Sequence, residues 1–406
     1  MINMQKKVLS NGLTVCYFPK EGFSKTYAII ATNYGAVDSI FTTNEGSFET
    51  PQGVAHYLEH KMFDQADGTN ALGLFGETGA SPNAFTSQTM TAYYFEGTDK
   101  FEKNLEILLN FVANPYFTPE SVEKEQGIIG QEIKMVEDSP NWICFVNLFE
   151  ALYHSHPIKE SIIGSVESIA KIDAEMLYLC HKVFYNASNM VLCVAGDVDF
   201  DLVVNMAEKI YPKPSVSLKS RDYKTEPETV VTSEISVNME VSLPLFMLGF
   251  KENTVADDLT HHEILANISS EYLLGKSSKL YSELYSRDLI DRNFEGEYNK
   301  FPQGGAFIIA GQSKNPQLVR EIVENEMKTI AVDTIQLENI VRAYTGKKVR
   351  MLDSFDDLCI SQVDAFFGGG NVSDFTKILS KISANDVEKY IKNIVKHSSL
   401  SIVNPN

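Results

Sequence analysis

Two histidines and a glutamate in one short stretch are the strongest candidates for chemistry in this sequence. His56 and His60 are four residues apart, so on a helix they share one face and can both reach one metal ion. Glu59 follows His56 by three residues and precedes His60, which places its carboxylate beside such an ion. Two imidazoles leave a catalytic zinc one protein ligand short of the usual three. The pattern therefore predicts a zinc site whose third ligand comes from elsewhere in the chain.

A second helix, predicted over 118–137, supplies candidates for that ligand. It begins with Thr118 as N-cap and Pro119 at the first helical position. Glu125 and Glu132 are seven residues apart, so they project from the same helical face. Carboxylates on an otherwise apolar face need a partner, and zinc is a good one. We expect the helix to be largely buried, because its other residues include Val122, Ile128, Ile129 and Ile133.

A histidine pair on a helix can also be a structural feature of a core. The second helix with its paired glutamates favours the metal site over that alternative. His154 and His156 lack ligand spacing, and we expect structural roles for them. His261 and His262 begin a helical stretch and, being adjacent, point apart, so we do not expect them to share a metal ion.

Composition and charge limit the class of protein. The chain has 406 residues, 44% of them hydrophobic, which predicts a globular protein of two or more domains. A net charge of −19 argues against nucleic acid or an anionic membrane as a partner. Five scattered cysteines indicate neither a disulfide framework nor a thiolate zinc site. We find no signal peptide and no apolar run long enough to span a membrane, so we expect a cytoplasmic location.

Periodicity and turn residues predict the elements around these motifs. Asn11-Gly12 is a tight turn in a hairpin over 8–18, and 213–228 has the prolines, serines and charges of an inter-domain linker. Further strands are predicted at 27–32 and 192–196, and further helices at 52–63, 99–113 and 166–184.

A repeat crosses the predicted linker. The segment 92–100 matches 306–314 in residue type and spacing, with an offset of 306 − 92 = 214. In both copies a strand enters a glycine turn and is followed by a helix. We therefore predict an α+β fold of two homologous halves, 1–212 and 229–406, each an antiparallel sheet packed with helices.

The motif HYLEH followed by VEKEQGIIGQEI resembles the inverted zinc motif of the pitrilysin and insulinase peptidases, the inverzincins. The likeness extends to the LSNGLTV hairpin, to 79–95, and to the FYNASNMVLCVAGDVD segment. It implies half of a clamshell that holds one zinc ion per chain. It also implies Glu132 as third ligand, Glu125 as the residue that orients a histidine, and Glu59 as general base. The resemblance further implies that substrate lies as an added strand along the sheet edge around Asn83-Ala84-Phe85-Thr86, with Asn83, Ala84 and Phe85 as substrate-binding residues.

The second half departs from the first at every metal-binding position. The offset of 214 carries His56 to Ser270, Glu59 to Leu273, His60 to Leu274 and Glu132 to Gly346. Many family members instead use this half for an arginine and a tyrosine seven residues later, which grip the substrate. Here Tyr285 and Arg292 occupy those positions with the two residue types exchanged, and Arg287 has Phe294 seven residues beyond it. The chain thus resembles the zinc-bearing subunit of two-chain bacterial members.

From these observations we expect a zinc metalloendopeptidase subunit that acts on short or unfolded peptides, a precursor or leader peptide being one candidate. Its expected partner is a homologous subunit that carries the Arg/Tyr pair. Two alternatives are a catalytically silent structural homologue and a carrier that closes on peptides without cutting them.

Overall fold

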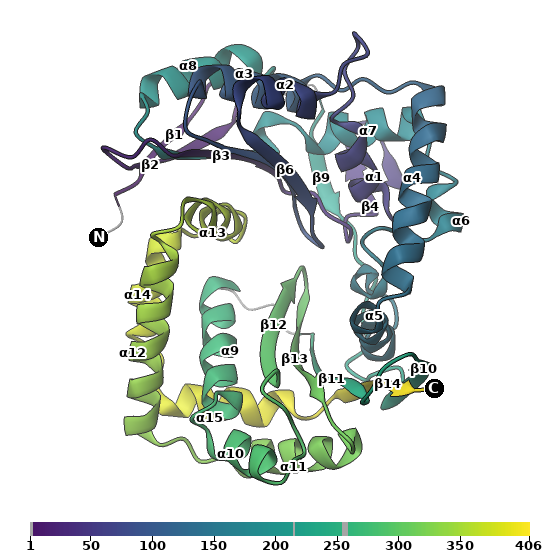
Figure 1. The fold of residues 1–406 in the computed structure, drawn as a ribbon, viewed down its shortest axis with the longest axis vertical. Coiled ribbons are helices and arrows are strands. Elements are labelled where there is room, and N and C mark those ends of the chain that lie inside the picture. Colours follow the sequence, from purple (N-terminus) through teal and green to yellow (C-terminus); the bar gives the residue numbers. More distant parts are fainter. Residues whose placement is uncertain (1–2, 214–215, 254–258) are drawn as a thin grey trace. The chain divides into compact units, whose positions relative to one another are not determined.

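The computed structural model describes residues 3–213, 216–253 and 259–406, which form two compact units (Figure 1). The first comprises Met1–Ile133, Ser161–Asp222 and Met351–Ser373, and the second comprises the remaining segments, Lys134–Glu160, Tyr223–Arg350 and Asp374–Asn406. This division differs from the predicted 1–212 and 229–406, since each unit takes one helical segment from the other part of the chain. Residues 214 and 215 of the predicted linker lie outside the described residues.

Packing explains the exchange of these two segments. Helix α5 (Pro140–Leu152) contacts strands β11 (Leu245–Glu252) and β14 (Ser398–Pro405) of the second unit. Helix α13 (Phe355–Phe367) contacts β3 (Thr26–Thr32) and β8 (Met190–Gly196) of the first. Each helix therefore buries its apolar side chains on the sheet of the other half of the chain.

The first unit is built on a six-stranded sheet of order β1-β2-β8-β3-β7-β6, in which only β2 and β8 run parallel. The predicted hairpin is confirmed, because β1 pairs antiparallel with β2 and Asn11 Oδ1 accepts the Leu13 amide in the turn. The predicted strands at 27–32 and 192–196 correspond to β3 and β8. The other strands of this sheet are β1 (Gln5–Val8), β2 (Thr14–Pro19), β6 (Ser81–Thr86) and β7 (Thr91–Gly97).

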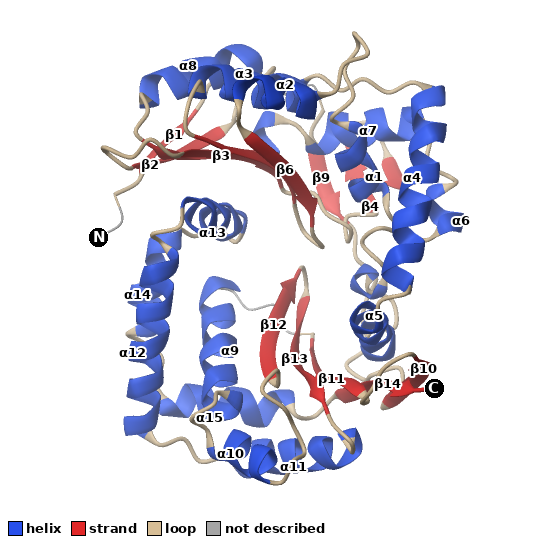
Figure 2. Cartoon of the chain, viewed as in Figure 1, coloured by secondary structure: helices blue, strands red, loops and turns tan. Residues whose placement is uncertain are grey.

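Helices cover both faces of this sheet (Figures 1 and 2). Helix α3 packs on one face with α2 and α8, and α13 packs on the other. Residues of α13 share a buried cluster with β2, β3 and β8 that includes Phe18, Ile29, Cys193 and Leu358. The bounds are α2 (Ala71–Thr78), α3 (Phe101–Ala113) and α8 (Phe200–Ile210).

The remaining helices of the first unit include those that carry the motifs. These are α1 (Val54–Lys61), α4 (Pro119–Glu137), α6 (Val166–Ile169) and α7 (Ala174–Phe184), and a small sheet of order β5-β4-β9 lies beside them. The single helix predicted over 166–184 is wrong, since residues 170–173 interrupt it between α6 and α7. Part of the predicted linker is a strand, β9 (Leu218–Arg221), which pairs with β4 (Ile40–Thr43). The third strand of this small sheet is β5 (Ser47–Glu49).

The second unit repeats the strand order of the first. Its sheet runs β10-β14-β11-β13-β12, with β10 and β14 parallel and every other pair antiparallel. Strand for strand, this order corresponds to β2-β8-β3-β7-β6 of the first sheet. The two copies of the repeat lie at β7 and the start of α3, and at β13 and the start of α11. The α+β fold with two homologous halves is therefore confirmed. The remaining strands are β10 (Glu234–Met239), β12 (Glu295–Phe301) and β13 (Gly304–Gln312).

Helices of the second unit pack around that sheet, with α9 against β12 and α15 against α9 and β11. No helix in the described part of the chain is long and apolar enough to cross a membrane. The bounds are α9 (Leu259–Leu274), α10 (Lys279–Ser286), α11 (Pro316–Thr329), α12 (Thr334–Met351), α14 (Phe375–Leu379) and α15 (Ala384–Ile394).

Candidate metal centre

Helices α1 and α4 bring together the residues that the sequence singled out. One donor atom from each of His56, His60 and Glu132 lies within 4.8 Å of the other two, and among the described residues this is the group that could hold a metal ion. His56 Nε2 is 3.5 Å from Glu132 Oε1, and His60 Nε2 is 3.5 Å from Glu132 Oε2. Two imidazoles and one carboxylate are the donor set of many catalytic zinc sites. The chemistry of the side chains therefore fits zinc.

The start of each helix follows from local sequence. Gly53 precedes α1 with φ of 87°, and a Cβ there would come within 2.7 Å of the Ile163 carbonyl oxygen, so glycine is required. Thr118 caps α4, since its hydroxyl accepts the amide of Ser121, as predicted.

The prediction that α4 is largely buried is wrong. Val122, Ile129 and Ile133 are buried, but Ile128 is 50% exposed. Only one stripe of the helix packs on the first unit. Glu125 and Glu132 flank that stripe, and the exposed fractions of their side chains are 16% and 31%.

Glu125 contacts a histidine, as the predicted orienting role requires. Its Oε1 lies 3.0 Å from His60 Nδ1, so a proton on Nδ1 leaves Nε2 free to bind a metal. Burial lowers the pKa of His60, but the hydrogen bond with Glu125 and the charges of Glu59 and Glu132 outweigh it, so the pKa is raised. The pKa of Glu132 is lowered, first by its contact with His56. His56 Nδ1 is buried without a hydrogen-bond partner in the described part of the chain.

Glu59 lies on the same helix and is held by Thr86, which the sequence placed on the predicted substrate edge but not in contact with the base. Glu59 is 8% exposed, and its Oε2 accepts a hydrogen bond of 2.7 Å from Thr86 Oγ1. Thr86 ends the edge strand β6, so one carboxylate oxygen is fixed by the sheet. The sequence predicted Thr86 as the last residue of the substrate segment, but it did not indicate this contact, because the packing of α1 on β6 is a tertiary contact.

The predicted substrate residues lie on β6, which pairs with β7 alone among the described strands and so leaves one edge free. Asn83 is exposed, and its Oδ1 accepts the Ala84 amide at 2.9 Å. Phe85 packs against the cluster that contains α13. The strand therefore presents an unpaired edge, with one amide covered by the Asn83 side chain.

The second unit has no equivalent donor group among its described residues. Ser270, Leu273 and Leu274 are buried on α9, and Ser270 Oγ donates to the Gly296 carbonyl at 3.0 Å. Gly346 lies on α12. These contacts are structural.

The residues at the Arg/Tyr positions are also placed by the structure. Arg292 is exposed, and the neighbouring Tyr285 hydroxyl raises the pKa of its guanidinium; Tyr285 is 42% exposed. Arg287 pairs with Glu283 at 2.8 Å, and Phe294 is buried. The two exchanged residues thus lie near each other.

Two of the other histidines that the sequence grouped, His156 and His262, make structural contacts. His156 Nδ1 accepts the Ile158 amide at 3.0 Å and its Nε2 lies 2.9 Å from the Pro302 carbonyl. His262 Nε2 lies 2.9 Å from Glu252 Oε2. All five cysteines are free and buried.

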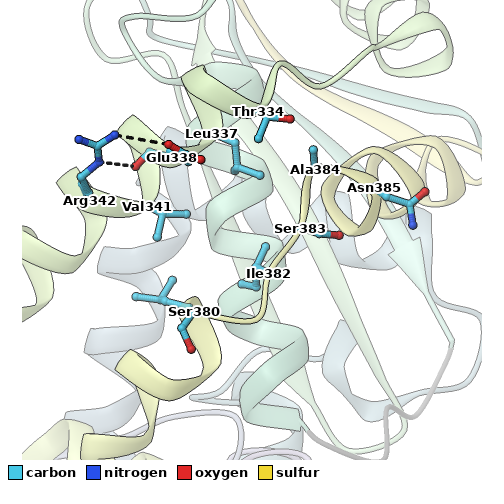
Figure 3. A pocket seen from close by; sticks show the side chains of 11 residues that line it. Thr334, Leu337, Glu338, Val341, Arg342, Ser380, Ile382, Ser383, Ala384 and Asn385 are labelled. Atoms are coloured by element: carbon cyan, nitrogen blue, oxygen red, sulfur yellow. Dashed lines mark hydrogen bonds and ion pairs between the residues drawn. The ribbon is translucent and has the colours of Figure 1, made fainter.

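A hollow of about 650 Å³ in the second unit lies between α12 and the segment that enters α15 (Figure 3). Leu337, Val341 and Ile382 line it, and the charged residues on its wall, Glu338 and Arg342, pair with each other at 3.6 Å. None of the predicted site residues lines this hollow, so it adds nothing to the metal centre.

Both parts of the chain match known protein families. Residues 44–166 match the family described as insulinase, peptidase family M16, and residues 171–346 match the one described as peptidase M16 inactive domain. The first match contains all of His56, Glu59, His60 and Glu132.

Relatives match over most of their length. The uncharacterized zinc protease YmfH of Bacillus subtilis is 35% identical over 410 residues, which are 97% of this chain and 94% of that protein. The beta subunit of mitochondrial-processing peptidase from Caenorhabditis elegans is 25% identical over 330 residues, 77% of this chain and 71% of the subunit. An M16-like peptidase from Alicyclobacillus acidocaldarius has a TM-score of 0.94 at 31% identity and covers 100% of this chain and 99% of its own.

Proposed function

The chain belongs to the insulinase family of peptidases, M16, and on that basis we propose that it is a zinc metalloendopeptidase subunit that hydrolyses short or unfolded peptides. One observation carries the proposal. The donor atoms of His56, His60 and Glu132 lie within 4.8 Å of one another, with the carboxylate of Glu59 on the same helix. An arrangement of this kind places a proton acceptor next to three metal ligands.

In this proposal His56, His60 and Glu132 hold one zinc ion per chain. Zinc, when bound, lowers the pKa of a water molecule toward neutrality and polarises the peptide carbonyl. Glu125 keeps the ring of His60 oriented, because its Oε1 accepts a hydrogen bond from Nδ1–H, with the two heavy atoms 3.0 Å apart. The same contact makes His60 a more basic ligand.

Glu59 acts as the general base and does not bind the ion. Its Oε2 is fixed by Thr86 at 2.7 Å, which leaves Oε1 to take the proton of the attacking water. The carboxylate can then deliver that proton to the leaving amine. Thr86 restricts the rotation of the Glu59 side chain and so positions the base.

The substrate is proposed to add to the free edge of β6 as an extra antiparallel or parallel strand. The main-chain groups of Ala84 would pair with the substrate main chain once the Asn83 side chain releases the Ala84 amide. Asn83 and Phe85, whose main-chain groups alternate toward β7, would flank that pair. Because such pairing reads main-chain atoms, it permits a loose sequence preference and favours unfolded or short peptides.

The proposed active form is a heterodimer with a homologous chain that carries the Arg/Tyr pair. Supporting this, Tyr285 and Arg292 stand at the two positions with the residue types exchanged, so neither position carries the residue that the family uses there. Loss of one donor to the developing oxyanion typically costs about 3 kcal/mol of transition-state stabilisation. A partner subunit would supply the missing donors.

The test combines metal analysis with cleavage of a fluorogenic peptide, by the chain alone and with its candidate partner. We expect one zinc per chain, weak cleavage by the chain alone and strong cleavage by the pair. A chain that binds one zinc and peptide but cleaves nothing under either condition would instead identify a peptide-binding homologue. Strong cleavage without any gain from the partner would contradict the heterodimer.

A further inference from the structure

Helix α1 carries a second pair of side chains that the chemistry above does not use. Tyr57 and Lys61 are four residues apart, as His56 and His60 are, and follow them by one position. They therefore form a second stripe, about 100° around the helix from the histidines. Both are buried, Tyr57 with 0% and Lys61 with 1% of its surface exposed. A lysine is almost never so deeply buried unless it is paired.

Both side chains bond the main chain of α4. The Tyr57 hydroxyl donates to the carbonyl oxygen of Val122. Lys61 Nζ donates to the carbonyl oxygen of Ser121 at 3.2 Å and forms an ion pair with Asp64. Two donors from α1 thus hold two consecutive carbonyls in the first turn of α4. We call these two contacts the α1–α4 clamp.

The same pair of helices makes the metal centre on the neighbouring stripe of α1. Glu132 is ten residues beyond Val122, which is about 15 Å along the helix axis. A shift of α4 by one residue would move Glu132 by about 1.5 Å and turn it by about 100°. Either change would remove its oxygens from the histidines, which now lie 3.5 Å away.

Apolar packing alone does not define this register. Val122, Ile129 and Ile133 are the buried residues of α4, and the hydrophobic effect that buries them is non-directional. Hydrogen bonds to two particular carbonyls are directional, because each requires its donor within about 3.2 Å and near a straight line. The clamp therefore supplies what the apolar stripe lacks.

We propose that Lys61 and Tyr57 are positioning residues, which set the register of α4 against α1 and so hold Glu132 opposite His56 and His60. This inference rests on the proposed zinc site, since the clamp acts through Glu132 and touches neither substrate nor metal. It assigns the buried lysine that follows the HxxEH motif a role in metal affinity.

The test compares two buried lysines with matched surroundings. Lys61→Met keeps most of the side-chain volume and removes both polar contacts. Lys251→Met is the control, because Lys251 in the second unit also bonds a carboxylate, Glu226 at 2.6 Å, and a carbonyl, Thr229 at 2.9 Å. The exposed fraction of its side chain is 0%. Both variants should unfold at a lower temperature than the wild type when free of metal.

Only Lys61→Met should also bind zinc more weakly, by about 10–100-fold, the range typical of residues that support a ligand. Zinc affinity is measured by competition with a chromophoric chelator at a temperature where circular dichroism shows both variants folded. Tyr57→Phe removes one hydroxyl and keeps the ring, so it should give a smaller fall of the same sign. This variant serves if Lys61→Met does not fold.

A second readout does not depend on zinc. In a crystal structure of the metal-free variant, Lys61→Met or Tyr57→Phe, α4 should be displaced relative to α1, and Glu132 should no longer face His56. An unmoved α4 with unchanged zinc affinity would overturn the proposal, as would equal losses of affinity in Lys61→Met and Lys251→Met. Failure of the proposed zinc function looks different, because the wild-type chain itself would then bind no zinc, and the displacement of α4 would still decide the clamp.

Discussion

Helices α1 and α9 pack at corresponding places on two sheets of the same strand order, yet α1 carries metal-binding side chains where α9 carries side chains that cannot bind a metal. Each helix contacts the edge strand of its own sheet: α1 contacts β6, and α9 contacts β12. Helix α1 offers two imidazoles and a carboxylate. The positions that correspond to these residues on α9 are Ser270, Leu273 and Leu274, all buried.

The edge strands differ in the same sense. A Cβ at Gly296 of β12 would come within 2.3 Å of Leu274 Cδ1 and 2.7 Å of Ser270 Oγ, so α9 packs directly on the strand. In the first unit, α1 meets its edge strand through the polar contact between Glu59 and Thr86. In the same architecture, the helix can thus pack directly on the edge strand through apolar side chains, or it can meet the strand through polar groups. The first half therefore keeps polar groups at this edge strand, and the second half fills the same place with apolar packing.

The largest expected effect is that of Glu59→Gln, which should lower kcat by on the order of 10²–10⁴-fold because it removes the general base. Zinc content should stay at the wild-type value, since the amide is nearly isosteric and Glu59 is not a ligand. Peptide cleavage and metal content are measured on the same preparation, with the partner chain present. Wild-type activity in this variant would rule out Glu59 as the base.

Next in size is the separation of the two glutamates of α4. Glu132→Ala should strip most of the zinc, because two histidines alone bind it weakly. Glu125→Ala should lower the affinity by about 10–100-fold, as expected for a residue that orients a ligand. Mass spectrometry under native conditions gives the metal content of both. If Glu125→Ala loses the zinc and Glu132→Ala retains it, the two roles are reversed.

For the second unit, the comparison predicts a loss of stability without a loss of zinc binding. Gly296→Ala should destabilise the protein by about 1–3 kcal/mol through overpacking against α9, with zinc affinity unchanged. Chemical denaturation measures the first quantity and chelator competition the second. Gly127→Ala is a matched control, because a Cβ at this exposed position of α4 meets nothing within 4 Å. A loss of zinc in Gly296→Ala would show that the second unit shares in the metal site.

A smaller effect concerns pH. The raised pKa of His60 means that the metal-free fold favours its protonated form, so this contribution to stability is present below about pH 6.5 and is lost as pH rises through the folded pKa. A proton on His60 also competes with zinc, so affinity should keep rising with pH above the ordinary imidazole range. Glu125→Gln should move that rise to lower pH. Chelator competition across neutral pH measures zinc affinity in both proteins. The same pH dependence in Glu125→Gln and wild type would show that Glu125 does not raise the pKa of His60.

Much of this arrangement could be predicted from the sequence. The spacing of His56 and His60 and the capped start of α4 are local signals, and the repeat at 92–100 and 306–314 indicated two similar halves. The exchange of α5 and α13 between the units could not be predicted, because helical periodicity defines an apolar face but not the sheet that covers it. The contact of Thr86 with Glu59 was missed for the same reason, since it joins a strand and a helix across 27 residues. Ile128 was expected to be buried because it is apolar, yet only one stripe of α4 is covered.

X-ray absorption at the zinc edge of the loaded protein tests the central claim most directly, because it reports the atoms bound to the metal. The account predicts two imidazole nitrogens and carboxylate or water oxygens at about 2.0–2.2 Å, with no sulfur at about 2.3 Å. In His56→Ala the imidazole contribution should fall to one ring. A sulfur ligand, or a spectrum unchanged in His56→Ala, would contradict the assignment of the metal centre to α1 and α4.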